Sequence, residues 1–315
     1  MAIIENNKVD LLKAITDNVE NAIFGKREVI ELAVCAFISG GHILIEDAPG
    51  VGKTSLVSAI ARSFACSFQR IQFTPDIMPS DITGFNIYNM KTGEFEFREG
   101  LIKTQIILAD EINRTPPKTQ SSLLEIMEEG KKTVDGKTYT MPRPFMVLAT
   151  QNPVEYIGTY PLPEAQLDRF MMRISIGYPE HSVESEMLTV LNQGKPLDSL
   201  EPVASADDLI YLQDALKEIY ADKKIKDYII DIISETRISE NLLLGASPRA
   251  SFDLFKASQA WAMYSGRDYV RPDDVIKMAG PVLEHRLVLK QEARTKKIRP
   301  EAIVQQAINN TKVPV

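Results

Sequence analysis

Cysteine, histidine and tryptophan are scarce in this sequence. Its 315 residues include two cysteines, three histidines and one tryptophan. The cysteines, Cys35 and Cys66, lack the CxxC spacing of zinc and redox sites, and the histidines are scattered along the chain. These features argue against a disulfide framework and against a structural zinc site.

Long apolar runs are also missing. No uncharged stretch approaches the roughly 18 to 20 residues of a membrane-spanning helix. The first seven residues, MAIIENN, do not form the basic start and apolar core of a secretory signal. We therefore expect no transmembrane segment and a location in the reducing cytoplasm.

The chain has no excess of basic charge. Its 36 Lys and Arg residues against 43 Asp and Glu give a formal net charge of −7. This balance argues against a protein that coats nucleic acid, although it is compatible with a local basic patch. With 44% hydrophobic and 25% charged residues, the chain has the composition of a globular protein with one large or two modest domains.

Short apolar runs alternate with helical patterns in the first part of the chain. This alternation predicts an α/β fold, in which a parallel sheet is flanked by helices on both faces. The expected strands are residues 41–46, 69–73, 106–109, 145–150 and 172–176. Two turn-rich segments, 76–100 and 131–143, predict hairpins inserted into this domain.

The pattern changes after Pro179, where amphipathic helices replace the strands. We expect an N-terminal helix in residues 1–22, an α/β core in 23–180, and an all-α lid subdomain with a C-terminal tail in 181–315. The expected lid helices are residues 205–220, 224–235, 250–264 and 273–289. Beyond Leu289 the sequence reads as a basic and then polar tail.

The strongest motif lies between the first expected strand and the helix that follows it. Phosphates are bound by backbone N–H groups at a helix start, with glycines that allow close approach, a lysine for the β- and γ-phosphates and a hydroxyl for Mg²⁺. Lys53 fills the lysine role and Thr54 the hydroxyl role. The residues expected to bind the nucleotide here are Pro49, Gly50, Val51, Gly52, Lys53, Thr54 and Ser55. Asp47 stands where the common pattern has its first glycine.

Two acidic residues follow the third expected strand. Strand ends of this kind face the ligand crevice of an open α/β sheet. We therefore expect Asp110 to hold Mg²⁺, directly or through water, beside the phosphates. Glu111 would point the other way along the strand alternation and polarise the attacking water. Without the phosphate loop upstream, such a pair would more often be a solvated turn.

Three further residues are candidates for the same site. Asn152 follows the fourth expected strand and could orient the water, although an Asn-Pro turn also explains it. Arg169 could reach a neighbouring subunit's γ-phosphate, or it could pair with Asp168. Arg249 lies in the first turn of a helix, where a cation is disfavoured unless an anion binds nearby. It is therefore a candidate nucleotide sensor on the lid, or else a solvated surface arginine.

These motifs, in this order, resemble those of the AAA+ ATPases. They read GVGKT, ADEIN, ATQNP, QLDRF and SPR along the chain. The stretches EDAPGVGKT and PEAQLDRF resemble the MoxR family within that class, and the likeness extends over residues 24–289. Asp47 also fits MoxR-like phosphate loops.

The resemblance implies a P-loop NTPase core with a helical lid, assembled as a homo-oligomer, usually a hexameric ring, with ATP at the subunit interfaces. It makes Asn152 sensor 1, Arg169 a trans-acting arginine finger and Arg249 sensor 2. It also implies that Phe24 and Gly25 pack on adenine, and that both hairpins point toward the pore of the ring.

The resemblance further implies a chaperone-like machine that remodels, matures or assembles a client protein. Its partner would be a protein with a von Willebrand factor A domain. A nucleic-acid motor and the ATPase subunit of a metal chelatase remain alternatives. The first hairpin has two basic against five acidic residues, net −3, whereas the second has four against one, net +3. Nucleic acid is therefore the less favoured substrate.

Overall fold

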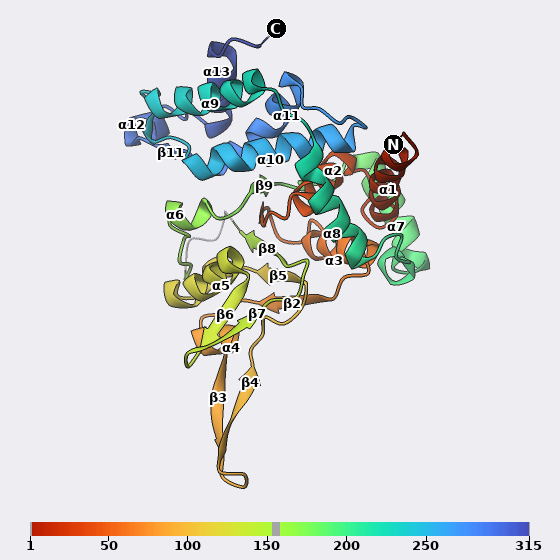
Figure 1. Ribbon diagram of the computed structural model, residues 1–315, viewed down its shortest axis with the longest axis vertical. Helices are drawn as coiled ribbons and strands as arrows, with labels where there is room; N and C mark the ends of the chain where they lie inside the picture. The colour runs from red at the N-terminus through yellow and green to blue at the C-terminus, as the bar shows by residue number, and fades with distance from the viewer. Residues whose placement is uncertain (1, 153–157, 315) are drawn as a thin grey trace.

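The computed structural model describes residues 2–152 and 158–314 (Figure 1). Five parallel strands form the central sheet in the order β2-β5-β8-β1-β9. The strands are β1 (Ile43–Glu46), β2 (Phe68–Gln72), β5 (Ile106–Asp110), β8 (Met146–Gln151) and β9 (Met172–Ile174). The predicted parallel α/β sheet is confirmed, with strand bounds that differ by one or two residues from those expected.

Both faces of the sheet are buried at its central strands β1, β5 and β8, which are almost continuously apolar. Ile43, Ile45 and Leu108 face one hydrophobic cluster, which contains α1 (Ala2–Glu20), α2 (Arg27–Ile38) and α3 (Lys53–Ser63). The alternate residues, such as Leu44 and Ala109, face a second cluster with α5 (Pro117–Glu129). The core therefore lies on both sides of β1, β5 and β8.

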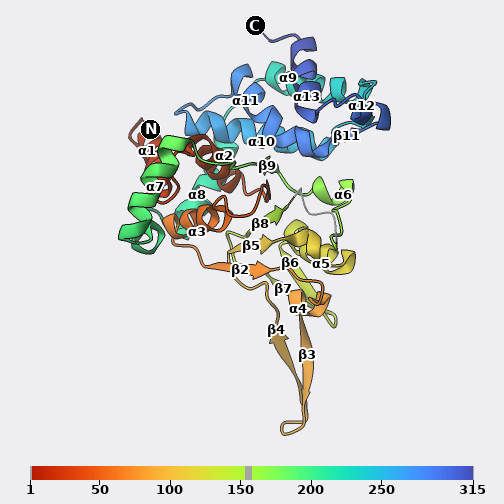
Figure 2. The ribbon, with the colours of Figure 1, turned by 180° about the vertical axis from the view of Figure 1, so that it is seen from behind.

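Two antiparallel hairpins extend from the second face. The pairs are β3 (Gly84–Asn89) with β4 (Glu94–Glu99), and β6 (Lys131–Val134) with β7 (Lys137–Thr140). They form within the two segments expected to carry hairpins, the first after the short helix α4 (Pro79–Thr83). Figures 1 and 2 show β3 and β4 projecting away from the rest of the chain, at the end opposite the C-terminal helices.

The C-terminal helices form a layer above the sheet (Figure 1). They are α9 (Lys223–Ile238), α10 (Pro248–Tyr264), α11 (Pro272–Leu283), α12 (Gln291–Thr295) and α13 (Pro300–Asn310). The polar tail expected after Leu289 is wrong, because this segment forms α12 and α13. Ile303, Val304 and Ala307 give α13 an apolar stripe that is buried against α9, which the charges between residues 290 and 299 obscured in the sequence.

Two smaller features also differ from the expectation. The short strands β10 (Leu242–Leu244) and β11 (Val288–Leu289) pair within the lid, and the helix expected over 273–289 ends at Leu283, where a 3-10 turn (Glu284–Arg286) leads to β11. Helices α7 (His181–Gln193) and α8 (Ala206–Ala215) precede the lid layer, and α8 packs on α2. The amide of Gln213 in α8 donates a hydrogen bond to the carbonyl of Phe37 at 2.9 Å. The helix that was expected to open the lid therefore lies on the α/β core.

Within the described residues, no helix is both long and apolar enough to cross a membrane.

Candidate functional site

The loop between β1 and α3 has the geometry of a phosphate cradle. Gly50 and Gly52 adopt positive φ angles of 85° and 93°, and a Cβ added at either would meet no atom within 4 Å. The ammonium of Lys53 donates to the carbonyls of Asp47 at 2.8 Å and Ala48 at 3.3 Å. Gly52 precedes α3 and has no side chain to cap its first N–H groups. Those donors and the lysine can therefore bind an anion.

Asp47 anchors this loop to the segment after β9. Its carboxylate accepts hydrogen bonds from the backbone N–H of Ile176, from the N–H of Gly177 at 3.2 Å and from the Ser175 hydroxyl at 3.1 Å. The residue is 8% exposed. Asp47 therefore fixes the start of the loop, a role that the comparison with the glycine pattern did not predict.

Asp110 ends β5 and is held by neighbours on both sides. Its Oδ1 accepts from the Thr150 hydroxyl at 2.6 Å, and its Oδ2 accepts from Arg70 Nη2 at 2.5 Å. Arg70 lies on β2 and Thr150 on β8, the two strands that flank β5. Carboxylate and hydroxyl oxygens are the donors that Mg²⁺ prefers. The Asp110 carboxylate and the Thr54 hydroxyl at the start of α3 therefore have the oxygen chemistry of magnesium ligands.

Glu111 lies just beyond β5, with a left-handed φ of 56°. Its N–H donates to the Thr150 hydroxyl at 2.8 Å, and its carboxylate accepts from Gln72 at 2.6 Å and pairs with Arg114 at 3.0 Å. The expectation that strand alternation directs Glu111 is wrong, because the strand ends one residue earlier. The left-handed turn and these polar neighbours set its direction instead.

Asn152 directly follows β8 and is 7% exposed. The parallel strands β1, β5 and β8 end at the same edge of the sheet, so Lys53, Asp110, Glu111 and Asn152 gather there. The motif that includes Asn152 ends at Pro153, which lies outside the described residues.

The segment expected to contact adenine lies beside the start of α7. Gly25 has a positive φ of 63°, and a Cβ there would come 3.0 Å from Val183 Cγ2. The ammonium of the next residue, Lys26, donates to the carbonyl of Tyr178 at 2.7 Å. Phe24 is half-buried. Tyr178 and Val183, which contact Lys26 and Gly25, thus closely follow residues 175–177, which Asp47 holds.

Arg169 lies at the opposite edge of the sheet. It precedes β9, and two residues later the N–H of Met171 donates to the carbonyl of His42, just before β1, at 2.8 Å. The last turn of α5 reaches the same edge, where the His42 ring bonds to the carbonyl of Met127 at 2.8 Å. A strand rises about 3.3 Å per residue, so His42 and Asp47 are roughly 16 Å apart along β1. Arg169 is therefore remote from the phosphate loop of its own chain.

Arg249 lies beside Arg169. Glu128 Oε2 forms an ion pair with Arg169 Nη1 at 2.9 Å, and Glu128 Oε1 accepts a hydrogen bond from Arg249 Nη2 at 2.7 Å. The lid therefore presents Arg249 beside Arg169, at the edge of the sheet opposite Lys53. The contacts at the junction between the lid and the core set this position of Arg249, and the sequence did not predict them.

That junction centres on Asp168 and Arg286. Ser247 is the N-cap of α10, and its hydroxyl also donates to Asp168 at 2.8 Å. Arg286 is 4% exposed and donates to the carbonyl of Phe170 at 2.7 Å and to Asp253 at 2.6 Å. These contacts tie the start of α10 to the residues on either side of Arg169.

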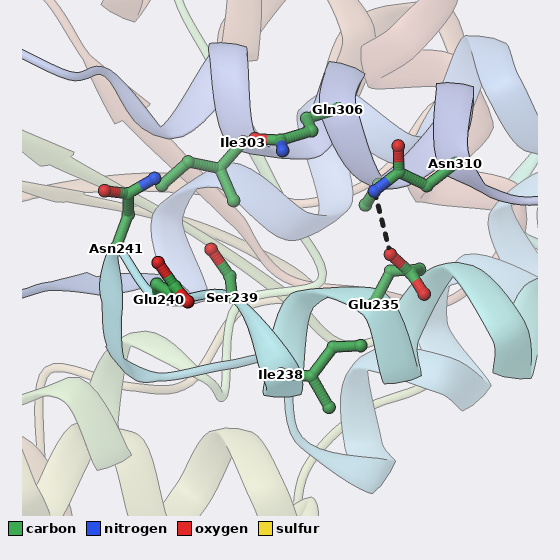
Figure 3. A pocket seen from close by; sticks show the side chains of 9 residues that line it. Glu235, Ile238, Ser239, Glu240, Asn241, Ile303, Gln306 and Asn310 are labelled. Atoms are coloured by element: carbon green, nitrogen blue, oxygen red, sulfur yellow. Dashed lines mark hydrogen bonds between the residues drawn. The ribbon is translucent and has the colours of Figure 1, made fainter.

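A cavity of about 250 Å³ lies elsewhere in the lid, between α9 and α13 (Figure 3). Figure 3 shows Asn310 and Glu235 at one end of it, joined by a hydrogen bond of 3.0 Å. Its lining, drawn from the described part of the chain, shares no residue with the expected nucleotide site.

The sheet order, the phosphate loop after β1, the acidic pair after β5 and the helical lid define an ATPase of the AAA+ class. Comparison with protein families agrees. A profile described as the ATPase family associated with various cellular activities (AAA) matches residues 42–172, and an AAA lid domain profile matches residues 234–307.

Similar proteins narrow the class to a family. The chain is 40% identical to Chaperone MoxR1 of Mycobacterium tuberculosis, over 98% of this chain and 83% of that protein. It is 50% identical to YeaC, an uncharacterized protein of Bacillus subtilis, over 97% and 95% of the two chains. A crystal structure of a candidate ATPase from Cytophaga hutchinsonii superposes with a TM-score of 0.91 at 37% identity, covering 99% and 97% of the two chains. The chain belongs to the MoxR family of AAA+ ATPases.

Proposed function

We propose that this protein hydrolyses ATP with Mg²⁺ in a ring of identical subunits. Each nucleotide would lie between the phosphate loop of one subunit and the Arg169–Arg249 pair of the next. The observation that carries this proposal is the position of these two groups at opposite edges of one sheet. Such an arrangement fits a head-to-tail interface, which closes into a ring. The family resemblance makes a hexamer the expected size.

The residues of one subunit would bind and orient ATP. Residues 49–55 would bind the phosphates through backbone N–H groups, with Lys53 at the β- and γ-phosphates. Phe24 and Gly25 would contact the adenine. Thr54 and Asp110 would hold Mg²⁺, which supplies charge neutralisation at the phosphate oxygens.

Two residues would position the attacking water. Glu111 would accept a hydrogen bond from the water and draw a proton toward its carboxylate, and Asn152 would orient the water. The guanidinium groups of Arg169 and Arg249, from the neighbouring subunit, would stabilise the negative charge that develops on the γ-phosphate oxygens.

An exposed aromatic stripe supports a protein client. Tyr88 and Phe95 meet edge to face on the first hairpin, and Phe97 stacks on Tyr139 of the second hairpin with ring centroids 4.2 Å apart. Phe95 is 72% exposed and Met90, at the hairpin tip, is 92% exposed. Exposed apolar groups of this kind mark interaction sites. We propose that they contact the client during remodelling, in line with the chaperone name of the mycobacterial relative.

The basic charge of the second hairpin gives little support to a nucleic-acid substrate. Lys132 is 5% exposed, and its ammonium donates to the carbonyl of Ile102 at 2.9 Å. It also lies 3.8 Å from the Glu99 carboxylate and 5.8 Å from the Phe97 ring centroid. This lysine is thus turned inward and not available to a phosphate backbone. The von Willebrand factor A partner and the cytoplasmic location stay predictions.

Mixing two inactive variants tests the shared site. Lys53→Ala should lose ATP binding, whereas Arg169→Ala should bind ATP and lose turnover. In a 1:1 mixture, about a quarter of the interfaces would pair an intact phosphate loop with an intact arginine face, so part of the steady-state ATPase activity should return. Loss of ATP affinity in both variants, without recovery on mixing, would contradict the shared site.

A further inference from the structure

We propose that Glu128 is a positioning residue that holds Arg169 and Arg249 together as one double cation for a neighbouring subunit's nucleotide. This inference rests on the proposed function, since it assumes that both arginines act across the interface. Glu128 itself would touch neither ATP nor water. Its role would be to set the position of two guanidinium groups that come from different parts of the fold.

The contacts divide one carboxylate evenly between the arginines. Oε2 forms an ion pair with Arg169 at 2.9 Å, and Oε1 accepts a hydrogen bond from Arg249 at 2.7 Å. Arg169 also donates to the carbonyl of Leu124, one turn earlier on α5, at 2.8 Å. Arg169 therefore contacts α5 twice, through this hydrogen bond and through the ion pair with Glu128, whereas Glu128 alone joins Arg249 of the lid to the same helix.

The charges explain why a carboxylate is needed. Two guanidinium groups that both contact one carboxylate repel each other, and the negative charge between them offsets this repulsion. The three side chains are 30%, 39% and 41% exposed for Arg169, Arg249 and Glu128, so the group is open at the surface. Each guanidinium has five N–H donors, and these contacts use only part of them. Donors therefore remain for a phosphate.

The place of Glu128 in its helix argues against a purely local role. It lies in the last turn of α5, which ends at Glu129 and is followed by Gly130 in a left-handed conformation. A carboxylate in the last turn is unfavourable, because the helix dipole places negative charge there. Glu128 therefore does not stabilise α5 through the helix dipole. The positive charges of the two arginines, which lie outside the helix, offset this unfavourable interaction.

Glu128→Gln is the informative change, because an amide has one acceptor oxygen where the carboxylate has two. We expect kcat for ATP to fall about ten-fold while KM stays within about two-fold, since the phosphate loop is untouched. Glu129→Gln, the next residue on α5, is the matched control and should leave both constants unchanged. Glu128→Asp keeps two oxygens and should recover most of kcat.

A double variant separates positioning from general damage. In an Arg249→Ala background, the single amide oxygen that Glu128→Gln leaves can serve Arg169 alone, so this change should cost less than about two-fold in kcat. A full ten-fold loss in that background, or a ten-fold loss in Glu129→Gln, would overturn the proposal. If Glu128→Gln melts at a much lower temperature than the parent, the same comparison is made at a temperature well below the melting points of all variants, where each of them is folded.

Subunit mixing distinguishes the failure of this inference from the failure of the proposed function. Glu128→Gln should regain activity when mixed with Lys53→Ala and gain nothing when mixed with Arg169→Ala, because its defect is on the arginine face. If Arg169→Ala recovers with Lys53→Ala but Glu128→Gln does not, only the role of Glu128 is overturned. If neither recovers, the shared site itself is wrong.

Discussion

The hydroxyl of Thr150 donates a hydrogen bond to Asp110 Oδ1 over 2.6 Å. Neither residue is open to solvent, with Thr150 at 0% and Asp110 at 7% exposure. The same hydroxyl accepts the N–H of Glu111 at 2.8 Å. One side chain of β8 therefore fixes both acidic residues that follow each other at the end of β5.

Removing this hydroxyl should impair both acidic residues at once. Thr150→Val keeps the shape of the side chain but leaves a buried carboxylate oxygen and a buried N–H without this partner, which should lower the free energy of unfolding by about 1–3 kcal/mol. We also expect a lower kcat and a higher Mg²⁺ concentration for half-maximal ATPase activity. Thr150→Ser keeps the hydroxyl and should behave close to the parent. Equal losses in both variants would show that the methyl group matters and the hydroxyl does not.

Replacing Glu111 by Gln should separate ATP binding from hydrolysis. The amide cannot take a proton from water, so turnover should fall by at least about 100-fold while nucleotide affinity is retained. Single-turnover hydrolysis and equilibrium binding of ATP measure the two effects. Gln72→Ala removes the hydrogen bond to Glu111 at 2.6 Å and should give a smaller loss of turnover. Normal hydrolysis by Glu111→Gln would show that another group polarises the water.

Asp47 provides a test of how the phosphate loop is held. In Asp47→Asn, one amide oxygen replaces a carboxylate that accepts the N–H groups of Ile176 and Gly177. We expect the dissociation constant for ATP to rise about ten-fold, with a loss of about 1–3 kcal/mol in the free energy of unfolding. Ser175→Ala removes only the hydroxyl contact and should have a smaller effect. Unchanged ATP affinity in Asp47→Asn would mean that the loop keeps its shape without this anchor.

His42 should make stability depend on pH. Its Nδ1 accepts the N–H of Val147 at 3.0 Å, so Nε2 carries the proton toward the Met127 carbonyl. Burial, with a smaller effect from Arg249, lowers the pKa of His42 to about 4 from a usual value near 6.5.

Because the unfolded chain binds this proton first, the free energy of unfolding should fall as pH drops from about 6.5 to 4, by up to roughly 3 kcal/mol. Urea denaturation at pH 7 and pH 5 measures the change. His42→Gln should be less stable than the parent at pH 7, but its free energy of unfolding should fall less between pH 7 and pH 5. Some decrease remains, because the pKa of buried His285 is also lowered and its protonation destabilises the fold in the same direction. His181→Gln, on an exposed residue of α7, is the control and should keep the parent's slope. An unchanged slope in His42→Gln would contradict the role of His42.

The sequence by itself determined those parts of the site that are local in the chain. The loop from Gly50 to Thr54 needs only a strand, two glycines and a helix start in succession, and Asp110 needs only the end of an apolar strand. The alternation of strands and helices likewise predicted the parallel sheet. Such features follow from the period of hydrophobic residues and from turn chemistry, both of which act over a few residues.

Tertiary structure decided which side chains meet across the fold. Arg70, Gln72 and Thr150 reach the acidic pair only because β5 lies between β2 and β8, an order that no local pattern encodes. Glu128 meets Arg249 only because buried Arg286 and Asp168 fix the lid against the residues before β9. The polar tail was misjudged for the same reason, since α13 gains its stability from burial against α9. Long-range burial and strand order, rather than local preference, place the phosphate loop and the Arg169–Arg249 pair at opposite edges of the sheet.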